Sequence, residues 1–315
     1  MTIRQIYNLA IESGIAADPR GKRGVQKWLE RQKKRYQKLT KDEREFFDRE
    51  SLTNPYADTR LHFGDPNQKV KTILAGIEIE EPEIALMKAL GKDIDLIISH
   101  HPTGRALAAL DEVMHLQADL MSAYGVPINI AEGVMRERIE QVGRTLSAAN
   151  HMKTVDAARL SGLPLMNIHT PTDNLVFQFL QKFLERKKPE TLGDIIEILR
   201  KIPEYKTAAL RAAGPRIFAG KEENRAGRIV AFDITGGTEG AREIYPELSR
   251  AGVGTIVGMH MKEENREEAF KHHLNVVIAG HISSDSLGMN LFLDQLAEKN
   301  IKIVPAGGLI RVKRK

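Results

Sequence analysis

The chain of 315 residues is long enough to bury more than one hydrophobic core. It has no cysteine, which excludes disulfides and leaves only histidine and carboxylate side chains as strong metal ligands. No apolar run approaches the ~18 residues of a membrane helix, and Met1-Thr-Ile-Arg does not resemble a signal peptide, so we expect a soluble cytoplasmic protein.

The net charge of +5 comes from the first fifty residues. Residues 1–50 hold thirteen Lys/Arg and eight Asp/Glu, and the other residues hold 34 of each. Apolar side chains at helical spacing predict an amphipathic helix through Trp28, and the capping box from Thr40 to Glu43 predicts the start of a second helix. The segment 20–41 has ten basic residues and one acid, which fits docking to RNA or an acidic protein, or a solvated helix face packed through Trp28.

Strands and helices alternate after a loop at residues 54–66 in which Asp58 and His62 cap turns or face a site. A strand–helix–strand unit with a short crossover predicts a parallel sheet. In chain order, we expect strands at 70–77 and 96–98 around a helix at 82–90, a helix at 107–124, a strand at 126–130, a helix at 134–160, a strand at 165–168 and a helix from Asn174.

A second α/β region is predicted after residue 187. It should contain a helix at 192–200, two or three strands between 205 and 234, and a helix at 240–250. A strand at 254–259, a helix at 263–273, a strand at 275–280 and a helix at 287–296 are expected next. The chain should end with strands at 301–304 and 309–312, joined by a hairpin at Gly307-Gly308. The turn from Ile234 to Gly240 reads as a tight turn or as a phosphate-binding loop, although Glu239 would repel an anion.

These elements predict a two-lobed α/β fold with mostly parallel or mixed sheets, a site in the cleft between the lobes, and an N-terminal helical extension. We expect residues 1–54 to form the basic extension, residues 55–187 with 275–315 the first lobe, and residues 188–274 the second lobe.

Histidines recur where predicted apolar strands end. His100 and His101 follow the strand at 96–98, and Pro102 stops that strand. Three more histidines also follow strands: His169, His260 and His281. Each of these has an acid four residues later, and so does His115, which lies in a helix. That spacing alone means little, because 42 of 315 residues are acidic, but strand ends in a parallel sheet share one edge, where α/β folds bind ligands. Alternatively, His100 and His101 lie in a surface loop.

Such a cluster suits metal-assisted hydrolysis. Three imidazoles and two carboxylates are too many for one tetrahedral ion with an open position, and they suffice for two ions ~3.5–4 Å apart that share a carboxylate and a water. The water bridging two divalent ions would be a hydroxide near neutral pH, and therefore a nucleophile. These ligands suit Zn, Fe, Mn, Co or Ni.

Three segments of the chain resemble the NIF-three-like family of dinuclear-metal proteins, often labelled type 2 GTP cyclohydrolase I homologues. They are Asp95-Leu-Ile-Ile-Ser-His-His-Pro, His169-Thr-Pro-Thr-Asp173 and Ala279-Gly-His-Ile-Ser-Ser-Asp285. Residues 58–64 and 230–237 resemble weaker motifs of that family, so the resemblance runs in order from about residue 55 to 300.

The resemblance implies a two-lobed α/β fold, a ring-shaped homohexamer and two bound metals. The implied metal ligands are His100, His101, Asp173, His281 and Asp285. His169 matches a position beside the metals, which suits a catalytic proton carrier.

The sequence departs from the family pattern in four places. Asp285 replaces the usual glutamate, the residues after His101 lack the usual bulky side chains, and His260 replaces a common acid and could add a ligand. Residues 1–50 have no counterpart in the family. These departures bear on bridging geometry and substrate choice.

Two functions fit these features. The first is a dimetal hydrolase of a small nucleotide-like or heterocyclic metabolite, in which His169 carries the proton. The second is a non-catalytic metal-binding scaffold or regulatory protein that recruits a partner through its basic N-terminal helices.

Overall fold

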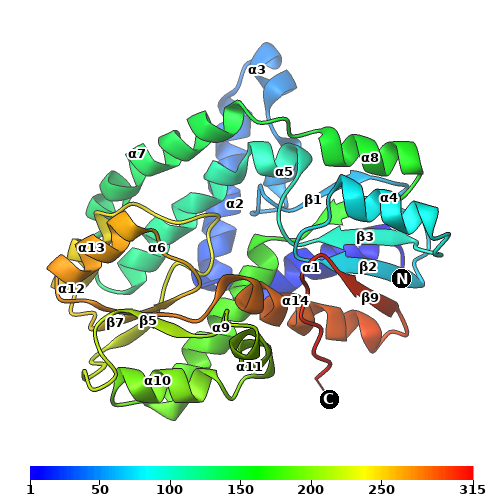
Figure 1. The fold of residues 1–315 in the computed structure, drawn as a ribbon. Coiled ribbons are helices and arrows are strands. Elements are labelled where there is room, and N and C mark those ends of the chain that lie inside the picture. Colours follow the sequence, from blue (N-terminus) through cyan, green and yellow to red (C-terminus); the bar gives the residue numbers. More distant parts are fainter. Residues whose placement is uncertain (315) are drawn as a thin grey trace.

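The structure is a computed structural model that describes residues 1–314, and it contains two β-sheets surrounded by helices (Figure 1). Five strands form the first sheet in the order β1-β4-β3-β2-β9, and four strands form the second in the order β5-β8-β7-β6. The predicted mixed α/β fold with mostly parallel sheets is confirmed. Within residues 1–314 no helix is both long enough and apolar enough to cross a membrane.

The first sheet is parallel except at β1. Its strands are β1 (Arg60–Phe63), β2 (Thr72–Gly76), β3 (Leu96–Ser99), β4 (Leu165–Asn167) and β9 (Lys302–Ala306). β2, β3, β4 and β9 run in the same direction, and β1 pairs with β4 in the opposite direction. β3 is buried along its whole length, as a central strand of a covered parallel sheet requires.

Alternate side chains of these strands enter two different hydrophobic clusters, as the two-residue period of a strand dictates. Ile73, Leu96 and Ile98 pack with α1 (Ile3–Ala17) and α14 (His281–Ala297). Leu74 and Ile97 pack on the other face with α4 (Glu81–Ala89) and α8 (Lys153–Ser161). The first sheet is therefore covered by helices on both sides.

The second sheet repeats this plan with its own antiparallel edge. Its strands are β5 (Arg216–Ala219), β6 (Ile229–Ala231), β7 (Thr255–Gly258) and β8 (Asn275–Ile278), with β5 antiparallel to β8. The helices of its hydrophobic cluster are α6 (His115–Ala123), α7 (Ile128–Ser147), α9 (Thr170–Lys187), α10 (Leu192–Leu199), α11 (Pro203–Leu210), α12 (Ile244–Arg250) and α13 (Glu263–Lys271).

Helices α9 and α14 pack on each other and link the two sheets. On α9, Val176 and Leu180 belong to the core of the second sheet, whereas Leu175 packs on the core of the first. On α14, Leu287 belongs to the core of the second sheet and Met289 to the core of the first. The first turns of both helices therefore lie where the carboxyl ends of strands from both sheets meet.

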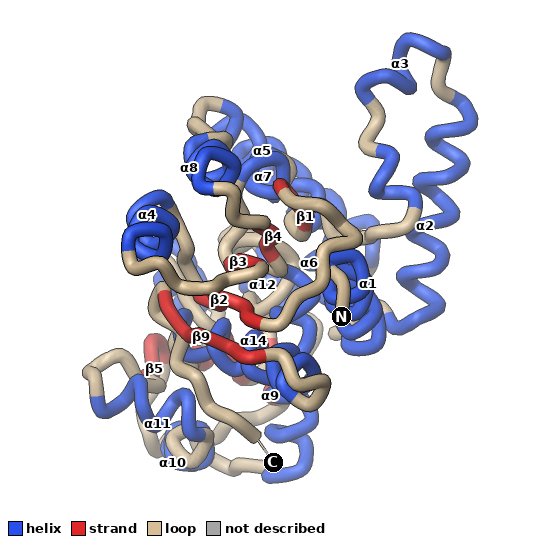
Figure 2. Tube along the Cα trace, turned by 90° about the vertical axis from the view of Figure 1, so that its right-hand side faces the viewer, coloured by secondary structure: helices blue, strands red, loops and turns tan. Residues whose placement is uncertain are grey.

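The N-terminal residues form helices, as predicted. α1 is buried through Ile3, Ile6 and Tyr7, while α2 (Gly21–Lys38) buries only Val25. The capping box at Thr40 starts α3 (Lys41–Phe46), which is followed by the short 3-10 helix η1 (Arg49–Leu52). Figure 2 shows α2 and α3 standing away from the two sheets as an arm. The division of the chain into an extension and two lobes stays a prediction.

Three predicted elements between residues 107 and 160 differ from the structure. Residues 126–130 are not a strand, because α7 begins at Ile128 directly after Pro127, whose fixed φ suits a helix start. The predicted helix at 134–160 is two helices, interrupted between Ser147 and Lys153 by a turn in which His151 Nε2 contacts the carbonyl oxygen of Leu146 at 2.7 Å. The helix expected at 107–124 is likewise divided, into α5 (Gly104–Ala108), the 3-10 helix η2 (Leu110–Met114) and α6.

The predicted strand at 309–312 is a tail without regular structure. β9 ends at Ala306, and Gly307 and Gly308 both have positive φ and turn the chain away. The backbone N–H of Ile310 then donates to Ser286 Oγ at 3.0 Å, so the tail lies along α14 and forms no hairpin with β9.

Candidate metal centre

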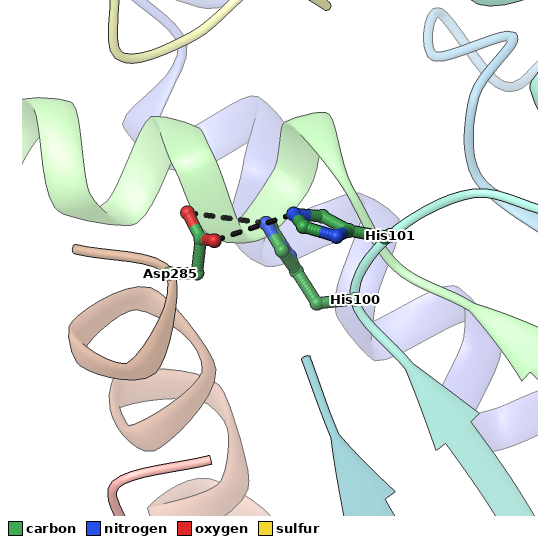
Figure 3. Close-up of side chains that lie close together, drawn as sticks. All are labelled: His100, His101 and Asp285. Carbon is green, nitrogen blue, oxygen red and sulfur yellow. Dashed lines mark ion pairs between the residues drawn. The ribbon is translucent and has the colours of Figure 1, made fainter. Parts of the chain in front are cut away.

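The predicted site residues come from three segments and lie together between the two sheets. His100 and His101 follow β3, His169 and Asp173 lie at the start of α9, and His281 and Asp285 lie in the first turns of α14. Figure 3 shows His100 and His101 pointing toward Asp285. The reading of the His100-His101 pair as a surface loop is excluded for His100, which is fully buried.

Backbone geometry sets the two adjacent histidines. The N–H groups of His100 and His101 continue the parallel ladder, donating to Gly76 O and Ile77 O at 2.9 Å each. α9 and α14 then approach closely, because Gly288 faces the carbonyl oxygen of Thr172 and any Cβ at that position would clash with it. The missing side chain at Gly288 thus allows Asp173 and Asp285 to approach the same histidines.

Two groups of potential ligands share His100. The first comprises His100, His101 and Asp285, and the second comprises His100, His169 and Asp173, with the ligand atoms of each group within 4.8 Å of one another. His100 Nε2 lies 3.3 Å from Asp173 Oδ1 and 3.5 Å from Asp285 Oδ1. His101 Nε2 lies 3.3 Å from Asp285 Oδ2.

The other two predicted histidines lie at the rim of these groups. His281 Nε2 is 3.5 Å from Asp285 Oδ2, and His169 Nε2 is 3.8 Å from Asp173 Oδ2. His281 is 43% exposed at its side chain, whereas His169 is only 9% exposed. The structure therefore brings all six predicted residues together, with His281 on the solvent side.

Three of the histidines use Nδ1 for a protein contact and direct Nε2 into the centre. His100 Nδ1 lies 3.1 Å from the carbonyl oxygen of Ile168 and 3.0 Å from Thr172 Oγ1. His169 Nδ1 lies 2.8 Å from Asp58 Oδ2, and His101 Nδ1 lies 3.0 Å from Glu78 Oε1. Because a carbonyl or carboxylate accepts a hydrogen at Nδ1, it fixes the tautomer that leaves the Nε2 lone pair free for a metal.

The atoms that face the centre have no hydrogen-bond partner among residues 1–314. They are His100 Nε2, Asp173 Oδ1, and both Oδ1 and Oδ2 of Asp285, and all are buried. A buried polar atom without a partner costs about 1–3 kcal/mol, and more when it is charged. These four atoms have lone pairs to which no hydrogen-bond donor is directed, and a cation binds such lone pairs. The residues present therefore fit a bound metal.

The two carboxyls differ in the direction in which their surroundings move the pKa. Burial raises the pKa of Asp173 well above its usual range, and the nearby Asp285 and Asp58 raise it further. Burial acts on Asp285 as well, but His100, His101 and His281 hold the pKa of that carboxyl well below its usual range. Burial lowers the pKa of His100 to about 4, which keeps its imidazole neutral and able to bind a metal.

Three residues orient the histidines through contacts across 23 to 111 positions of the chain: Glu78, Thr172 and Asp58. No sequence pattern indicates Glu78 or Thr172, whereas Asp58 is predicted to cap a turn or face a site, and it faces His169. His62, its companion in that expectation, contacts Asn167 Oδ1 at 2.7 Å through Nε2.

His260 lies beside the centre but turns to a different acid. Its ring stacks edge-on against His281 with centroids 5.0 Å apart, and its Nδ1 lies 3.4 Å from Asp233 Oδ2. Although burial opposes it, the carboxylates of Asp233 and Glu239 raise the pKa of His260 to about 9. The acid four residues after His260, Glu264, forms no ion pair with it among the described residues.

The turn between Ile234 and Gly240 is a packed structural turn. Gln117 Nε2 donates to Gly236 O at 2.9 Å and to Thr238 O at 2.7 Å. The Glu239 side chain is buried and accepts from the N–H of Lys262 at 2.6 Å. The tight-turn reading of this segment therefore fits the structure, because its carbonyl oxygens and Glu239 are already engaged.

Searches with this sequence found no matching family model and no matching curated protein. Among solved structures, a NIF3 superfamily protein from Sphaerobacter thermophilus is similar, with 28% identity over 80% of this chain and 92% of that one, and a TM-score of 0.68. Reduced HcgD from Methanocaldococcus jannaschii shares the fold, with 14% identity over 84% of this chain and 94% of that one, and a TM-score of 0.51.

Proposed function

The chain belongs to the NIF3 superfamily, and from that premise we propose that its His/Asp cluster binds two divalent cations with which the protein hydrolyses a small metabolite. The observation that carries the proposal is the set of buried, unpartnered atoms on His100, Asp173 and Asp285. Ion pairing within the protein does not satisfy them, and divalent cations would.

The proposed ligands are His100, His101, Asp173, His281 and Asp285. Zn, Fe, Mn, Co or Ni suits this set of nitrogen and oxygen donors, and two such ions would supply an activated water near neutral pH. Asp285 lies within 3.5 Å of three imidazoles, which supports it as the shared carboxylate. Glu78 and Thr172 hold the rings of His101 and His100 in place through Nδ1.

We propose that His169 carries the proton. Its Nδ1 is 2.8 Å from Asp58, which accepts the Nδ1 hydrogen and holds the ring, so that Nε2 is left to accept a proton on the side of Asp173. Asp58 also accepts from Thr170 Oγ1 at 2.6 Å, which fixes the carboxylate. The same Nε2 makes His169 a potential ligand in the second group, and the test below separates the two roles.

A hollow beside the centre supports a small ring-containing substrate. Its volume is 310 Å³, within the range of small-molecule sites, and it is bordered by His260 and His281. Phe218, Met259 and Met261 provide apolar surface for a ring, and Arg216 provides a cation for a phosphate or carboxylate. A nucleotide-like or heterocyclic metabolite combines both features.

The first test measures metal and turnover in the same preparation. Elemental analysis should give two equivalents of a divalent metal in the wild-type protein, and a screen of nucleotides and heterocycles should give turnover. His101→Ala should reduce both metal content and turnover, whereas His115→Ala, at an exposed histidine with an acid four residues later, should change neither.

His169→Gln separates a proton carrier from a ligand. A carrier predicts normal metal content with a large loss of turnover and a shifted pH profile, while lost metal would make His169 a ligand. If the wild-type protein binds metal but turns over no substrate, the hydrolase proposal fails and a non-catalytic metal-binding scaffold takes its place.

We also propose that the protein forms the homohexamer that the resemblance implies. Light scattering on the purified chain should give six times the mass of 35.3 kDa. A monomer or dimer at micromolar concentration would contradict it.

A further inference from the structure

The exposed face of α2 carries a row of cations. Its residues at spacings of three and four are Arg23, Lys27, Arg31, Lys34 and Lys38, and we call this set the basic stripe. At 3.6 residues per turn these positions fall on one side of the helix, opposite the buried Val25. The stripe extends about 22 Å along the helix axis.

These cations are not used inside the protein. All five residues of the basic stripe are exposed, and none forms an ion pair with any residue in the range 1–314. Elsewhere on the surface, cations such as Arg144 and Arg159 pair with an acid one turn away on the same helix. The only acid of α2 is Glu30, which contacts Gln26. Since the chain outside residues 1–50 is neutral, its excess positive charge is concentrated around this arm.

A groove runs beside the basic stripe. Its volume is 560 Å³, and one wall holds Lys27, Arg31 and Lys34. Glu30 and Arg20 line the same wall, and Arg20 is already paired with Asp18. The opposite wall is formed by the end of α6 and the start of α7, at Ser122, Ala123 and Ile128. Asp119 also lines the groove.

We propose that this groove binds the phosphate backbone of a single-stranded nucleic acid. Successive phosphates along a strand are the anions that match a row of unpaired cations at successive helical turns. The groove is bounded by α2 on one side and by the ends of α6 and α7 on the other, which favours a single strand over a duplex. Aromatic side chains do not line it, so the contact is to phosphates and is independent of base sequence.

Other anionic partners fit less well. A membrane surface would require an apolar face on α2 beside the cations, but the apolar side of the helix is turned inward, with Val25 buried and Leu29 and Tyr36 half-buried. An acidic protein would need its own complementary apolar contacts, and Ile128 is the only large apolar side chain that lines the groove. Both partners are included in the test.

The experiment is a binding titration of the full chain with a labelled 20-nucleotide single strand, as DNA and as RNA, by fluorescence anisotropy. We expect both to bind, with log K falling against log salt with a slope of about −3, as four to five phosphate contacts give. The triple variant Lys27→Gln, Arg31→Gln, Lys34→Gln should weaken binding at least about tenfold and reduce the slope by about 2.

A matched control removes the same charge elsewhere. Lys92→Gln, Lys187→Gln and Lys299→Gln together change three exposed cations that form no ion pair among the described residues, and they should leave binding within about twofold of wild type. Because all six positions are exposed, both triple variants should fold, and circular dichroism and metal content check this.

Four results would overturn the proposal. They are no binding of the single strand at low salt, an equal loss in both triple variants, tighter binding of a duplex of the same length, and tighter binding of polyglutamate or of phosphatidylserine vesicles. None of these depends on turnover, so they are separate from failure of the hydrolase proposal.

Discussion

Two buried polar clusters lie on the same helix, α14, and they differ in how their atoms are partnered. At its start, Asp285 has two buried oxygens with no hydrogen-bond donor within residues 1–314. Further along, Asn290 and Asp294 join Glu204 of α11 and the tail residues Arg311 and Arg314 in a network whose side-chain atoms are paired.

The paired network is complete without a ligand. Arg314 donates two hydrogen bonds of 2.6 Å to Glu204, which is fully buried, and Asn290 donates a third at 2.8 Å. Arg311 donates to Asp294 at 2.5 Å. Burial of acids therefore does not by itself indicate a binding site in this protein. What distinguishes the candidate metal centre is that four such unpartnered atoms, on His100, Asp173 and Asp285, lie together.

We expect the largest loss of stability from a substitution that breaks the paired network. Arg314→Leu leaves Glu204 buried without its cation, and we expect it to lower the free energy of unfolding by about 3 kcal/mol, measured by urea denaturation. Arg144→Leu removes an exposed partner of Glu140 and should cost no more than about 0.5 kcal/mol. Equal effects of the two changes would show that the tail network is not structural.

Removal of metal should lower the stability of the protein only through the unpaired cluster around Asp285. At a free metal concentration one hundred times the Kd, binding stabilises the folded state by about 2.7 kcal/mol, so a chelator should lower the unfolding temperature of wild type. Asp285→Asn should remove that response, and Arg314→Leu should keep it in full. If the chelator shifts Asp285→Asn as much as wild type, the cations bind elsewhere.

The residues that orient the ligands should have a smaller effect. Thr172→Val removes the hydroxyl 3.0 Å from His100 Nδ1, and we expect the metal Kd to rise about tenfold, measured by calorimetry. Thr145→Val, at an exposed hydroxyl that donates to Gln141 O, is the control and should leave the Kd unchanged. An unchanged Kd for Thr172→Val would mean that Ile168 O alone orients the ring.

The smallest expected effect is a gain in stability, which Asp173→Asn should show in metal-free protein. Because the pKa of Asp173 is raised in the folded state, the folded state binds its proton more tightly than the unfolded state does. The associated stability is present below the unfolded pKa and is lost as pH rises through the folded value. At pH 8, with chelator, Asp173→Asn should therefore be more stable than wild type, and this gain should vanish as the pH falls toward 4. A difference that does not vary with pH would contradict the assignment.

The sequence predicted the elements that position the site, because each has a local signal. β3 is a continuous apolar run ended by Pro102, and Thr40 and Glu43 form the expected capping box. The rule that parallel strand ends share one edge then placed His100 and His169 together without any contact information. His281 follows β8 of the second sheet, so its position beside them was implied by the family resemblance and not by that rule.

The remaining features depend on distant contacts that have no local pattern. Glu78 and Asp58 meet their histidines across 23 and 111 positions of the chain, and the role of Gly288 follows only from the approach of α9 to α14. The turn after Ser147 interrupts an amphipathic pattern that reads as one helix. The tail bonds to the Ser286 and Asn290 side chains and pairs with none of the described strands.

The sharing of His100 has a consequence for the order in which the centre fills. A neutral imidazole has one free lone pair once Nδ1 is engaged, so His100 Nε2 serves one ion and cannot complete both groups at once. The first equivalent of metal should therefore occupy the richer set of donors, and the second must recruit His281 or His169 instead. Titration with a single metal should give two unequal affinities, and partly loaded protein should hold one ion per chain before any chain holds two.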